Sequence, residues 1–195
     1  MILAVIGTGY AGLVYGVCLS DLGNAVYCVD KDKSNIEMLL HGEIPFDEPG
    51  LEELIKKNRF EGRLAFTSDI SVPVQDAEIL FITAGTSQAL SGEENLLYIE
   101  QAAREIALAM NGYKIIVVRG VVPVGTNERI KQIISGLTEN PFDIVMMPEF
   151  LEDIRTDSQE AAAIIMKLHS PVTNSIIATD LWSKKMIHEP QSTRP

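Results

Sequence analysis

Three glycines near the start of the chain are spaced so that a phosphate group could approach the backbone. Gly7, Gly9 and Gly12 follow the apolar run Ile2–Ile6 in the pattern G-x-G-x-x-G. The first glycine permits a tight turn from a strand into a helix, and the second lets the backbone come close to a pyrophosphate. The third lets the helix pack closely on the strand. The expected helix would direct its first amides, and the positive end of its dipole, at the phosphates.

A carboxylate stands at the end of the next apolar run. Ala25–Val29 predicts a second buried strand, and Asp30 follows it directly. An acid at this position of a dinucleotide-binding unit accepts hydrogen bonds from the hydroxyls of a ribose. A purely structural strand–turn–helix is the alternative, but strand, glycines, helix, second strand and acid occur here in the expected order. This order predicts a bound dinucleotide, and Asp30 favours NAD because its charge would repel the 2′-phosphate of NADP.

The elements that must position these residues alternate along the chain. Apolar runs predict strands over residues 2–6, 25–29, 63–67, 78–83, 114–119 and 143–147. Apolar periodicity predicts helices over residues 13–22, 34–40, 51–58, 95–110 and 126–135, with Ser34 and Glu37 forming a capping box. Strands alternating with helices predict an α/β fold, with a doubly wound, mostly parallel, Rossmann-like sheet in a single domain over residues 1–151. Ligands of such sheets bind beyond the carboxyl ends of the strands.

Composition excludes several classes of partner. The net charge of -11 argues against nucleic acid, which is bound by clustered Lys and Arg. No signal peptide precedes the first strand and no apolar run is long enough to span a bilayer, which predicts a cytoplasmic protein without a membrane partner. Cys18 and Cys28 are expected to be small buried hydrophobic residues and not a disulfide framework. The three histidines show no metal-ligand spacing, so no metal is expected.

Five segments of the chain resemble those of the nucleotide-sugar 6-dehydrogenases, and most of all the enzymes that oxidise UDP-glucose. They occur in one order, at residues 7–14, 47–54, 84–86, 122–126 and 148–151. The resemblance implies an NAD-dependent, two-step oxidation of the primary alcohol of a nucleotide sugar, UDP-glucose first, to a carboxylate. It also implies a separate C-terminal sugar-nucleotide domain and a homodimer held together by a long central helix.

The resemblance also assigns roles to single residues. Gly7, Tyr10 and Ala11 fall on the pyrophosphate turn, and Asp30 falls on the adenine ribose. Gly85 and Thr86 lie beside the cofactor. Glu149, in the catalytic and substrate-binding Pro-Glu-Phe-Leu stretch, is a candidate catalytic residue, and so is Asp153 shortly after it.

The chain departs from the family pattern at other positions. Asn35 stands where the family has Lys or Arg, so it can donate a hydrogen bond to the cofactor but brings no charge. Val121 replaces a threonine that helps to hold the cofactor and a reacting water, and a methyl group cannot take that role. His188 stands in place of the catalytic lysine, and no residue corresponds to the nucleophilic cysteine.

The segment after Leu151 is expected to be a remnant. The strand that the family has there is expected to be missing through an internal deletion, and residues from Ser158 onward are expected to pack less well. Residues 152–189 would then form a helix and a strand, over 158–172 and 176–181, that lead to the start of the central helix. Residues 190–195 would form a disordered tail after Pro190.

Two functions remain open at this stage. The chain is either the NAD-binding part of a nucleotide-sugar dehydrogenase, truncated at its C-terminus and inactive alone, or a non-catalytic NAD-binding module that regulates or pairs with a complete enzyme. A hydroxyacid or hydroxyacyl-CoA dehydrogenase would share the first strand–helix–strand unit. It would not explain residues 122–126 or 148–151.

Overall fold

The computed structural model describes residues 1–83, 92–148, 153–172 and 177–179, and eight strands within them form one sheet. The strands are β1 (Ile2–Ile6), β2 (Ala25–Val29), β3 (Leu64–Thr67), β4 (Ile79–Thr83), β5 (Lys114–Arg119), β6 (Phe142–Met147), β7 (Asp153–Arg155) and β8 (Ile177–Thr179). The helices are α1 (Tyr10–Asp21), α2 (Lys33–His41), α3 (Leu51–Phe60), α4 (Ser71–Asp76), α5 (Gly92–Ala109), α6 (Thr126–Ser135) and α7 (Gln159–His169). The predicted strands and helices are confirmed to within three residues at their ends.

The strand order places the start of the chain at the centre of the sheet. The order is β3-β2-β1-β4-β5-β6-β7-β8, and the pairs from β3 to β6 are all parallel. From β1 the chain first adds strands on one side, through β2 and β3, and then on the other, from β4 onward. The predicted doubly wound, mostly parallel sheet is therefore confirmed. The change of direction beside β1 is the place where open α/β sheets bind ligands.

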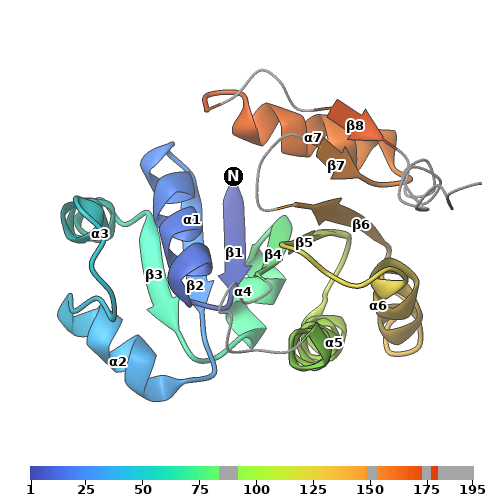
Figure 1. Cartoon of the computed structure of the whole chain (residues 1–195), viewed down its shortest axis with the longest axis horizontal. Helices are drawn as coiled ribbons and strands as arrows, with labels where there is room; N and C mark the ends of the chain where they lie inside the picture. The colour runs from blue at the N-terminus through green and yellow to red at the C-terminus, as the bar shows by residue number, and fades with distance from the viewer. Residues whose placement is uncertain (84–91, 149–152, 173–176, 180–195) are drawn as a thin grey trace, which may run out of the picture.

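Helices cover both faces of this sheet (Figure 1). In β1, Leu3 and Val5 belong to a core cluster with α1, α2, α3 and α7. Ala4 and Ile6 point the other way, into a cluster with α4, α5 and α6. This alternation follows from the two-residue period of a strand. Because both faces are covered, every residue of β4 is buried. This agrees with the continuous apolar runs in the sequence.

Two helix starts differ from the prediction. The N-cap of α2 is Asp32, whose Oδ1 accepts hydrogen bonds from the backbone N–H groups of Ser34 at 2.9 Å and Asn35 at 3.3 Å. The predicted capping box on Ser34 is therefore wrong, because an aspartate two residues earlier is at least as good a cap. Helix α1 begins at Tyr10, three residues before the prediction, so Gly9 is its N-cap and Gly12 lies in its first turn.

The prediction for the segment after Leu151 is wrong in two respects. A strand is present there: β7 bridges β6 in the antiparallel direction through Met146 and Arg155 and pairs with β8 in parallel. Helix α7 is also well packed, since Ala161, Ile165 and Leu168 are buried in the same core cluster as α1. The expected start of the central helix and the expected tail, over residues 180–195, lie outside the described residues.

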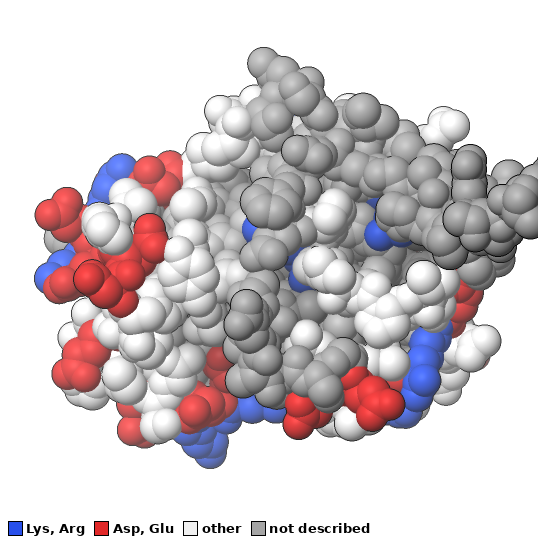
Figure 2. All heavy atoms as spheres, viewed as in Figure 1, with Lys and Arg blue, Asp and Glu red and all other residues white. Residues whose placement is uncertain are grey.

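Among the residues that the structure describes, no helix is both long enough and apolar enough to cross a membrane. In Figure 2 acidic side chains gather over α3, with Lys and Arg between them. This agrees with the net charge of -11.

Candidate functional site

The turn from β1 into α1 is built on glycines that the packing requires. Gly7 has a φ of 102°, which favours glycine, and its N–H donates to the carbonyl of Val29 at 2.8 Å. A Cβ on Gly7 would lie 2.7 Å from both the Thr83 Oγ1 atom and the Tyr98 hydroxyl. A Cβ on Gly12 would overlap the carbonyl group of Gly7. These two glycines let β1, α1 and β4 approach one another.

Gly9 has no packing reason to be a glycine. A Cβ there would meet no atom within 4 Å, and the φ of -61° is open to any residue. Gly9 is the N-cap residue of α1, and no side chain caps the start of this helix with a hydrogen bond. The first amide of α1 that bonds back along the helix is that of Leu13, to the Gly9 carbonyl at 2.9 Å. The amides before it, those of Tyr10 and Ala11 included, have no carbonyl partner within the helix, so the helix end forms an open cradle for an anion.

Asp30 stands beside this turn in a network of hydrogen bonds. Its Oδ2 accepts from the Thr8 N–H at 2.8 Å and from the Thr8 hydroxyl at 2.6 Å. The amide Nδ2 of Asn35 donates to the Thr8 hydroxyl at 2.7 Å, and Oδ1 of Asp30 accepts from the Asp32 N–H at 3.0 Å. A carboxylate offers about four acceptor positions. Three are used by these bonds, and Nδ2 of Asn35 makes a longer contact of 3.5 Å with Oδ2, so one position on Oδ1 remains for a ribose hydroxyl. The structure therefore brings together the predicted residues Asp30 and Asn35 with the glycine turn.

Thr8 is the central residue of this network, and sequence reasoning missed it. Its side chain is fully buried, and its hydroxyl joins Asp30 to Asn35. A threonine between the first two glycines, with a carboxylate expected at the end of β2, was the available signal. The glycine pattern itself assigns no role to this position.

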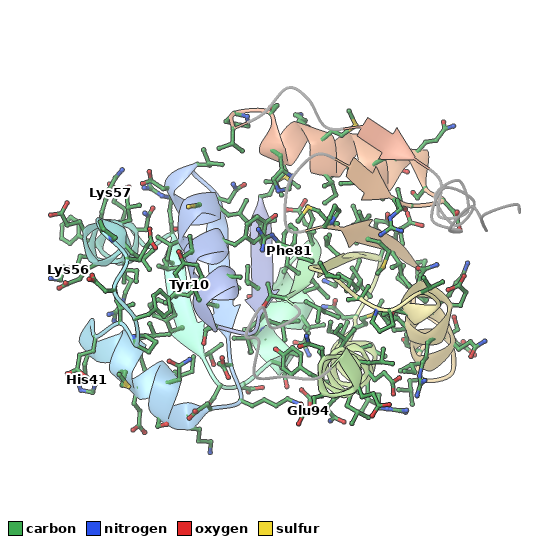
Figure 3. All side chains as sticks on the ribbon, viewed as in Figure 1. Tyr10, His41, Lys56, Lys57, Phe81 and Glu94 are labelled. Carbon is green, nitrogen blue, oxygen red and sulfur yellow. The ribbon has the colours of Figure 1, made fainter. Side chains whose placement is uncertain are left out.

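The side chain of Tyr10 turns away from the cradle. Its hydroxyl donates to Glu48 Oε2 at 2.6 Å, which raises the pKa of the Tyr10 phenol. Its ring packs edge-on against Phe46, with the ring centroids 4.8 Å apart. Tyr10 lies on α1, facing the loop before α3 (Figure 3). Only its backbone amide is thus placed for the predicted role at a pyrophosphate.

On the other side of β1, the loop after β5 presents apolar side chains at the rim of the sheet, which is formed by the loops that follow the carboxyl ends of the strands. Val121 and Val124 are each 83% exposed. The loop begins at Gly120, whose φ of 127° favours glycine and whose N–H donates to the Met147 carbonyl at 2.9 Å. Val121 offers a hydrophobic surface there but no side-chain hydrogen bond, and its predicted place in the cofactor site stays a prediction.

Below this rim, a buried polar pair joins α1 to α7. The Tyr15 hydroxyl lies 2.6 Å from Nε2 of His169, and Nδ1 of His169 lies 2.7 Å from the Ile165 carbonyl. A carbonyl only accepts, so Nδ1 carries the proton and Nε2 accepts from Tyr15. Arg119 lies over the Tyr15 ring, with its guanidinium carbon 4.5 Å from the ring centroid. Burial lowers the pKa of His169, and the Arg119 charge lowers it further.

The structure leaves three predicted site residues unplaced and gives only the backbone of a fourth. Gly85, Thr86 and Glu149 lie outside the described residues. Asp153 begins β7, at the far side of β6 from the glycine turn, but its side chain lies outside the described part. Their roles stay predictions.

Neither cysteine suits nucleophilic catalysis. Cys28 is buried, and burial raises the pKa of its thiol to about 12. Cys18 is exposed, so the prediction that it is buried is wrong; it lies on the outer side of α1. Partial desolvation, and then the charges of Asp21 and Glu48, raise the pKa of the Cys18 thiol. A raised pKa leaves little thiolate at neutral pH. Among the described residues, no cluster of His, Cys, Asp and Glu could hold a metal ion.

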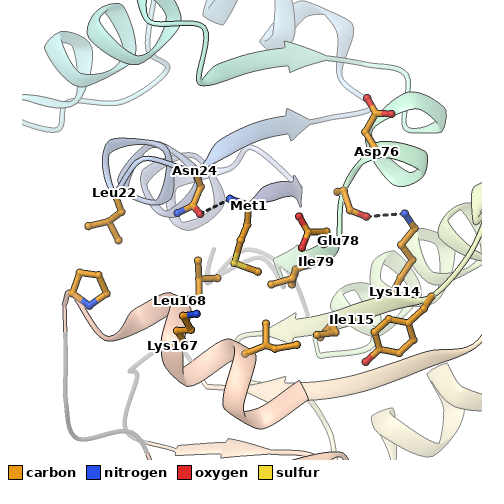
Figure 4. A pocket seen from close by; sticks show the side chains of 14 residues that line it. Met1, Leu22, Asn24, Asp76, Glu78, Ile79, Lys114, Ile115, Lys167 and Leu168 are labelled. Carbon is orange, nitrogen blue, oxygen red and sulfur yellow. Dashed lines mark hydrogen bonds between the residues drawn. The ribbon is translucent and has the colours of Figure 1, made fainter. Parts of the chain in front are cut away.

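A cavity of about 560 Å³ lies at the amino ends of the parallel strands, whereas the glycine turn lies at their carboxyl ends (Figure 4). It is lined by Met1 before β1, by the turn between α1 and β2, by the first residues of β4 and β5 and by α7, and its lining includes Asn24, Ile115 and Leu168. Lys114 Nζ at its border donates to the Ala77 carbonyl at 2.7 Å. Parallel sheets bind ligands at their carboxyl edge, so this cavity does not compete with the glycine turn for the role of cofactor site.

Comparison with known proteins decides between the dehydrogenase classes. The sequence model of the UDP-glucose/GDP-mannose dehydrogenase family, NAD binding domain, matches residues 1–180. The chain belongs to this family. The described fold is thus the NAD-binding domain of the UDP-glucose/GDP-mannose dehydrogenases, and the predicted cofactor, NAD, is confirmed at the level of the family.

Relatives in this family support the assignment along most of the chain. UDP-glucose 6-dehydrogenase TuaD of Bacillus subtilis is 41% identical over 201 residues, covering 95% of this chain and 44% of that protein. The UDP-glucose 6-dehydrogenase of Rhizobium meliloti is 43% identical over 157 residues, covering 78% of this chain and 36% of that protein. The chain therefore spans less than half the length of these relatives.

Solved structures of the UDP-glucose/GDP-mannose dehydrogenases agree with the fold. A UDP-glucose dehydrogenase from Pyrobaculum islandicum superposes with a TM-score of 0.84 at 27% identity, over 95% of this chain and 47% of that one. GDP-mannose dehydrogenase from Pseudomonas aeruginosa gives a TM-score of 0.85 at 29% identity, over 96% and 48%.

Proposed function

We propose that this chain supplies the NAD-binding half of a nucleotide-sugar 6-dehydrogenase that oxidises the primary alcohol of a UDP-sugar, UDP-glucose first, to a carboxylate. The observation that carries the proposal is the open cradle at Gly9, with the Asp30 carboxylate beside it. The names of the relatives support the substrate, since two of them are UDP-glucose 6-dehydrogenases.

The fit of the site to NAD rests on the groups that face the cradle. The free amides at the start of α1 would hold the pyrophosphate, with the helix dipole behind them. The remaining acceptor position on Oδ1 of Asp30 would take a hydroxyl of the adenosine ribose, while Thr8 and Asn35 keep the carboxylate oriented. Bound NAD supplies the acceptor for the hydride of the sugar alcohol. We assign Gly85 and Thr86 to the same cofactor site, and Val121 to its apolar wall.

The sugar side of the reaction needs groups beyond those described. Glu149 and Asp153 are our candidates for contact with the substrate. The second oxidation step requires a thiolate that traps an aldehyde, and neither Cys18 nor Cys28 can provide it. We therefore propose that a sugar-nucleotide domain completes the site, and that a homodimer forms through the central helix of the complete enzyme.

Two measurements on the 195-residue chain test this function. Titration calorimetry with NAD is expected to show one binding site per chain, and absence of binding would refute the proposal. A mixture of the chain, NAD and UDP-glucose is expected to give no NADH absorbance, because groups that act as a unit lose nearly all rate when some are missing. Sustained formation of two NADH per sugar would mean that residues of this chain do the work of the thiolate.

A second candidate is a non-catalytic NAD-binding subunit. The observation that favours it is the exposed side chain of Val121. Its methyl groups stand where the family pattern has a threonine, whose hydroxyl helps to hold the cofactor and a reacting water. The test adds the purified chain to a complete UDP-glucose 6-dehydrogenase such as TuaD. A change in that enzyme's turnover that saturates with the chain supports the regulatory subunit, and unchanged turnover argues against it.

A further inference from the structure

An ion pair stands directly beside the predicted ribose site. Lys31 follows Asp30 at the end of β2, and its Nζ lies 2.9 Å from the Glu105 Oε1 atom of α5. The two side chains are 50% and 28% exposed. A lysine next to the ribose acid could bind the 2′-phosphate of NADP, because an ammonium group binds phosphate as a point charge. In this structure that ammonium group already has a carboxylate partner.

Packing of α5 against the glycine turn fixes the position of Glu105. Tyr98 lies two turns before Glu105 on the same side of the helix, and its hydroxyl reaches the place that a Cβ on Gly7 would take. Burial raises the pKa of Tyr98, and the charges of Asp30 and Glu105 raise it further. The carboxylates of Asp30, after β2, and of Glu105, on α5, therefore both lie close enough to Tyr98 to raise its pKa.

Helix stability does not explain a carboxylate at Glu105. The residue lies near the C-terminal end of α5, which carries the negative end of the helix dipole. An acidic side chain there does not stabilise the helix. Its Oε1 also accepts from Nε2 of Gln101 at 2.8 Å, which orients the carboxylate toward Lys31. The charged residues next to Lys31 in the sequence are Asp30, Asp32 and Lys33, and its ion-pair partner Glu105 comes from α5.

We propose that Glu105 is a specificity-determining residue of the cofactor site: it holds the Lys31 ammonium group away from a 2′-phosphate and so favours NAD over NADP. Glu105 does not contact the reacting atoms and acts through Lys31, so it is a positioning residue. The inference rests on cofactor binding at the Gly9–Asp30 site. It adds to the role of Asp30, because Glu105 neutralises the lysine that directly follows Asp30 in the sequence.

The test measures binding of NAD and NADP to the chain by titration calorimetry, with the variant Glu105→Gln. Glutamine keeps the side-chain volume and an oxygen that can accept from Gln101, so the fold is preserved. The ratio of the NADP to the NAD dissociation constant is expected to fall by about two- to fivefold, the range that exposed ion pairs provide. The same shift is expected for adenosine 2′,5′-bisphosphate against 5′-AMP, which isolates the ribose end.

Two further variants separate the mechanism from a general change of charge. Glu53→Gln, on the exposed side of α3, changes the net charge equally and is expected to leave the ratio as in the wild type. Adding Lys31→Ala to Glu105→Gln is expected to remove the gain in NADP binding, and the gain is expected to shrink as salt is raised.

The outcomes are distinct. An unchanged ratio in Glu105→Gln, with normal NAD binding in the wild-type chain, would overturn the role of Glu105 and leave the cofactor site intact. An equal shift in Glu53→Gln, or a gain that survives removal of Lys31, would also overturn it. A wild-type chain that binds no NAD would overturn both the site and this inference.

Discussion

Replacing Gly9 by alanine should separate cofactor binding from folding. Gly9 has a backbone conformation that alanine adopts without strain, and an added Cβ would meet no atom within 4 Å. Removing a glycine from the unfolded chain stabilises by about 0.4–1 kcal/mol. Alanine is a poorer N-cap than glycine, which offsets a similar amount. The free energy of unfolding is therefore expected to change by less than about 0.5 kcal/mol.

The same methyl group would stand in the cradle where a pyrophosphate must come close to the first amides of α1. NAD affinity is expected to fall at least about tenfold, or ~1.4 kcal/mol. Urea unfolding and titration calorimetry on one preparation measure the two effects. Gly12→Ala is the matched comparison: its Cβ would overlap the Gly7 carbonyl group and lie 2.8 Å from Thr83 Oγ1, so it should destabilise the fold by about 1–3 kcal/mol or more. Wild-type NAD affinity in Gly9→Ala, or a loss of stability as large as that of Gly12→Ala, would refute the reasoning.

Two other substitutions test the groups around the turn. Asp30→Ala should weaken NAD binding by about 1–3 kcal/mol, and should also destabilise the fold by a similar amount, because the buried Thr8 N–H and hydroxyl lose their acceptor. Unchanged NAD affinity in calorimetry would remove Asp30 from the site. The pKa of His169 is lowered in the fold, so the unfolded chain binds its proton first as pH falls. Stability should therefore be fully present above about pH 6.5 and fall below it, by at most about 1.4 kcal/mol per pH unit. Urea midpoints from pH 7.5 to 5.5 measure this, and an equally steep decline in His169→Gln would show that other groups cause it.

Features that depend on neighbouring residues could be predicted from the sequence. The apolar runs gave the strands because both faces of the sheet are covered, and the glycine pattern marked a turn whose sterics involve residues close in the chain. Asp32 was missed as the cap of α2 because Ser34 satisfies the same local rule. The family resemblance identified the cofactor, which the glycine spacing alone would leave uncertain.

Features that depend on distant contacts could not be predicted. The hydroxyl of Thr8 bonds to Asn35 on α2, and Lys31 pairs with Glu105 on α5, and no local pattern indicates either contact. Strand β7 has only three residues, too few for a recognisable apolar run. It is a strand because it bridges β6 through the pair Met146 and Arg155. The exposure of Cys18 depends on how α1 lies against its neighbours, because one side of a helix faces solvent.

The central place of β1 also bears on the order in which the fold can form during synthesis. Leu3 pairs with Val26 on one side and with Ile79 on the other, so the earliest of the eight described strands has one near partner and one distant partner. The unit β1–α1–β2 can assemble as soon as β2 has left the ribosome, whereas the other edge of β1 stays unpaired until β4 has been made. An open strand edge is prone to pairing with other chains. The nascent chain thus passes through a stage in which the strand that carries the glycine turn is exposed to misassembly, and this stage ends when β4 is added.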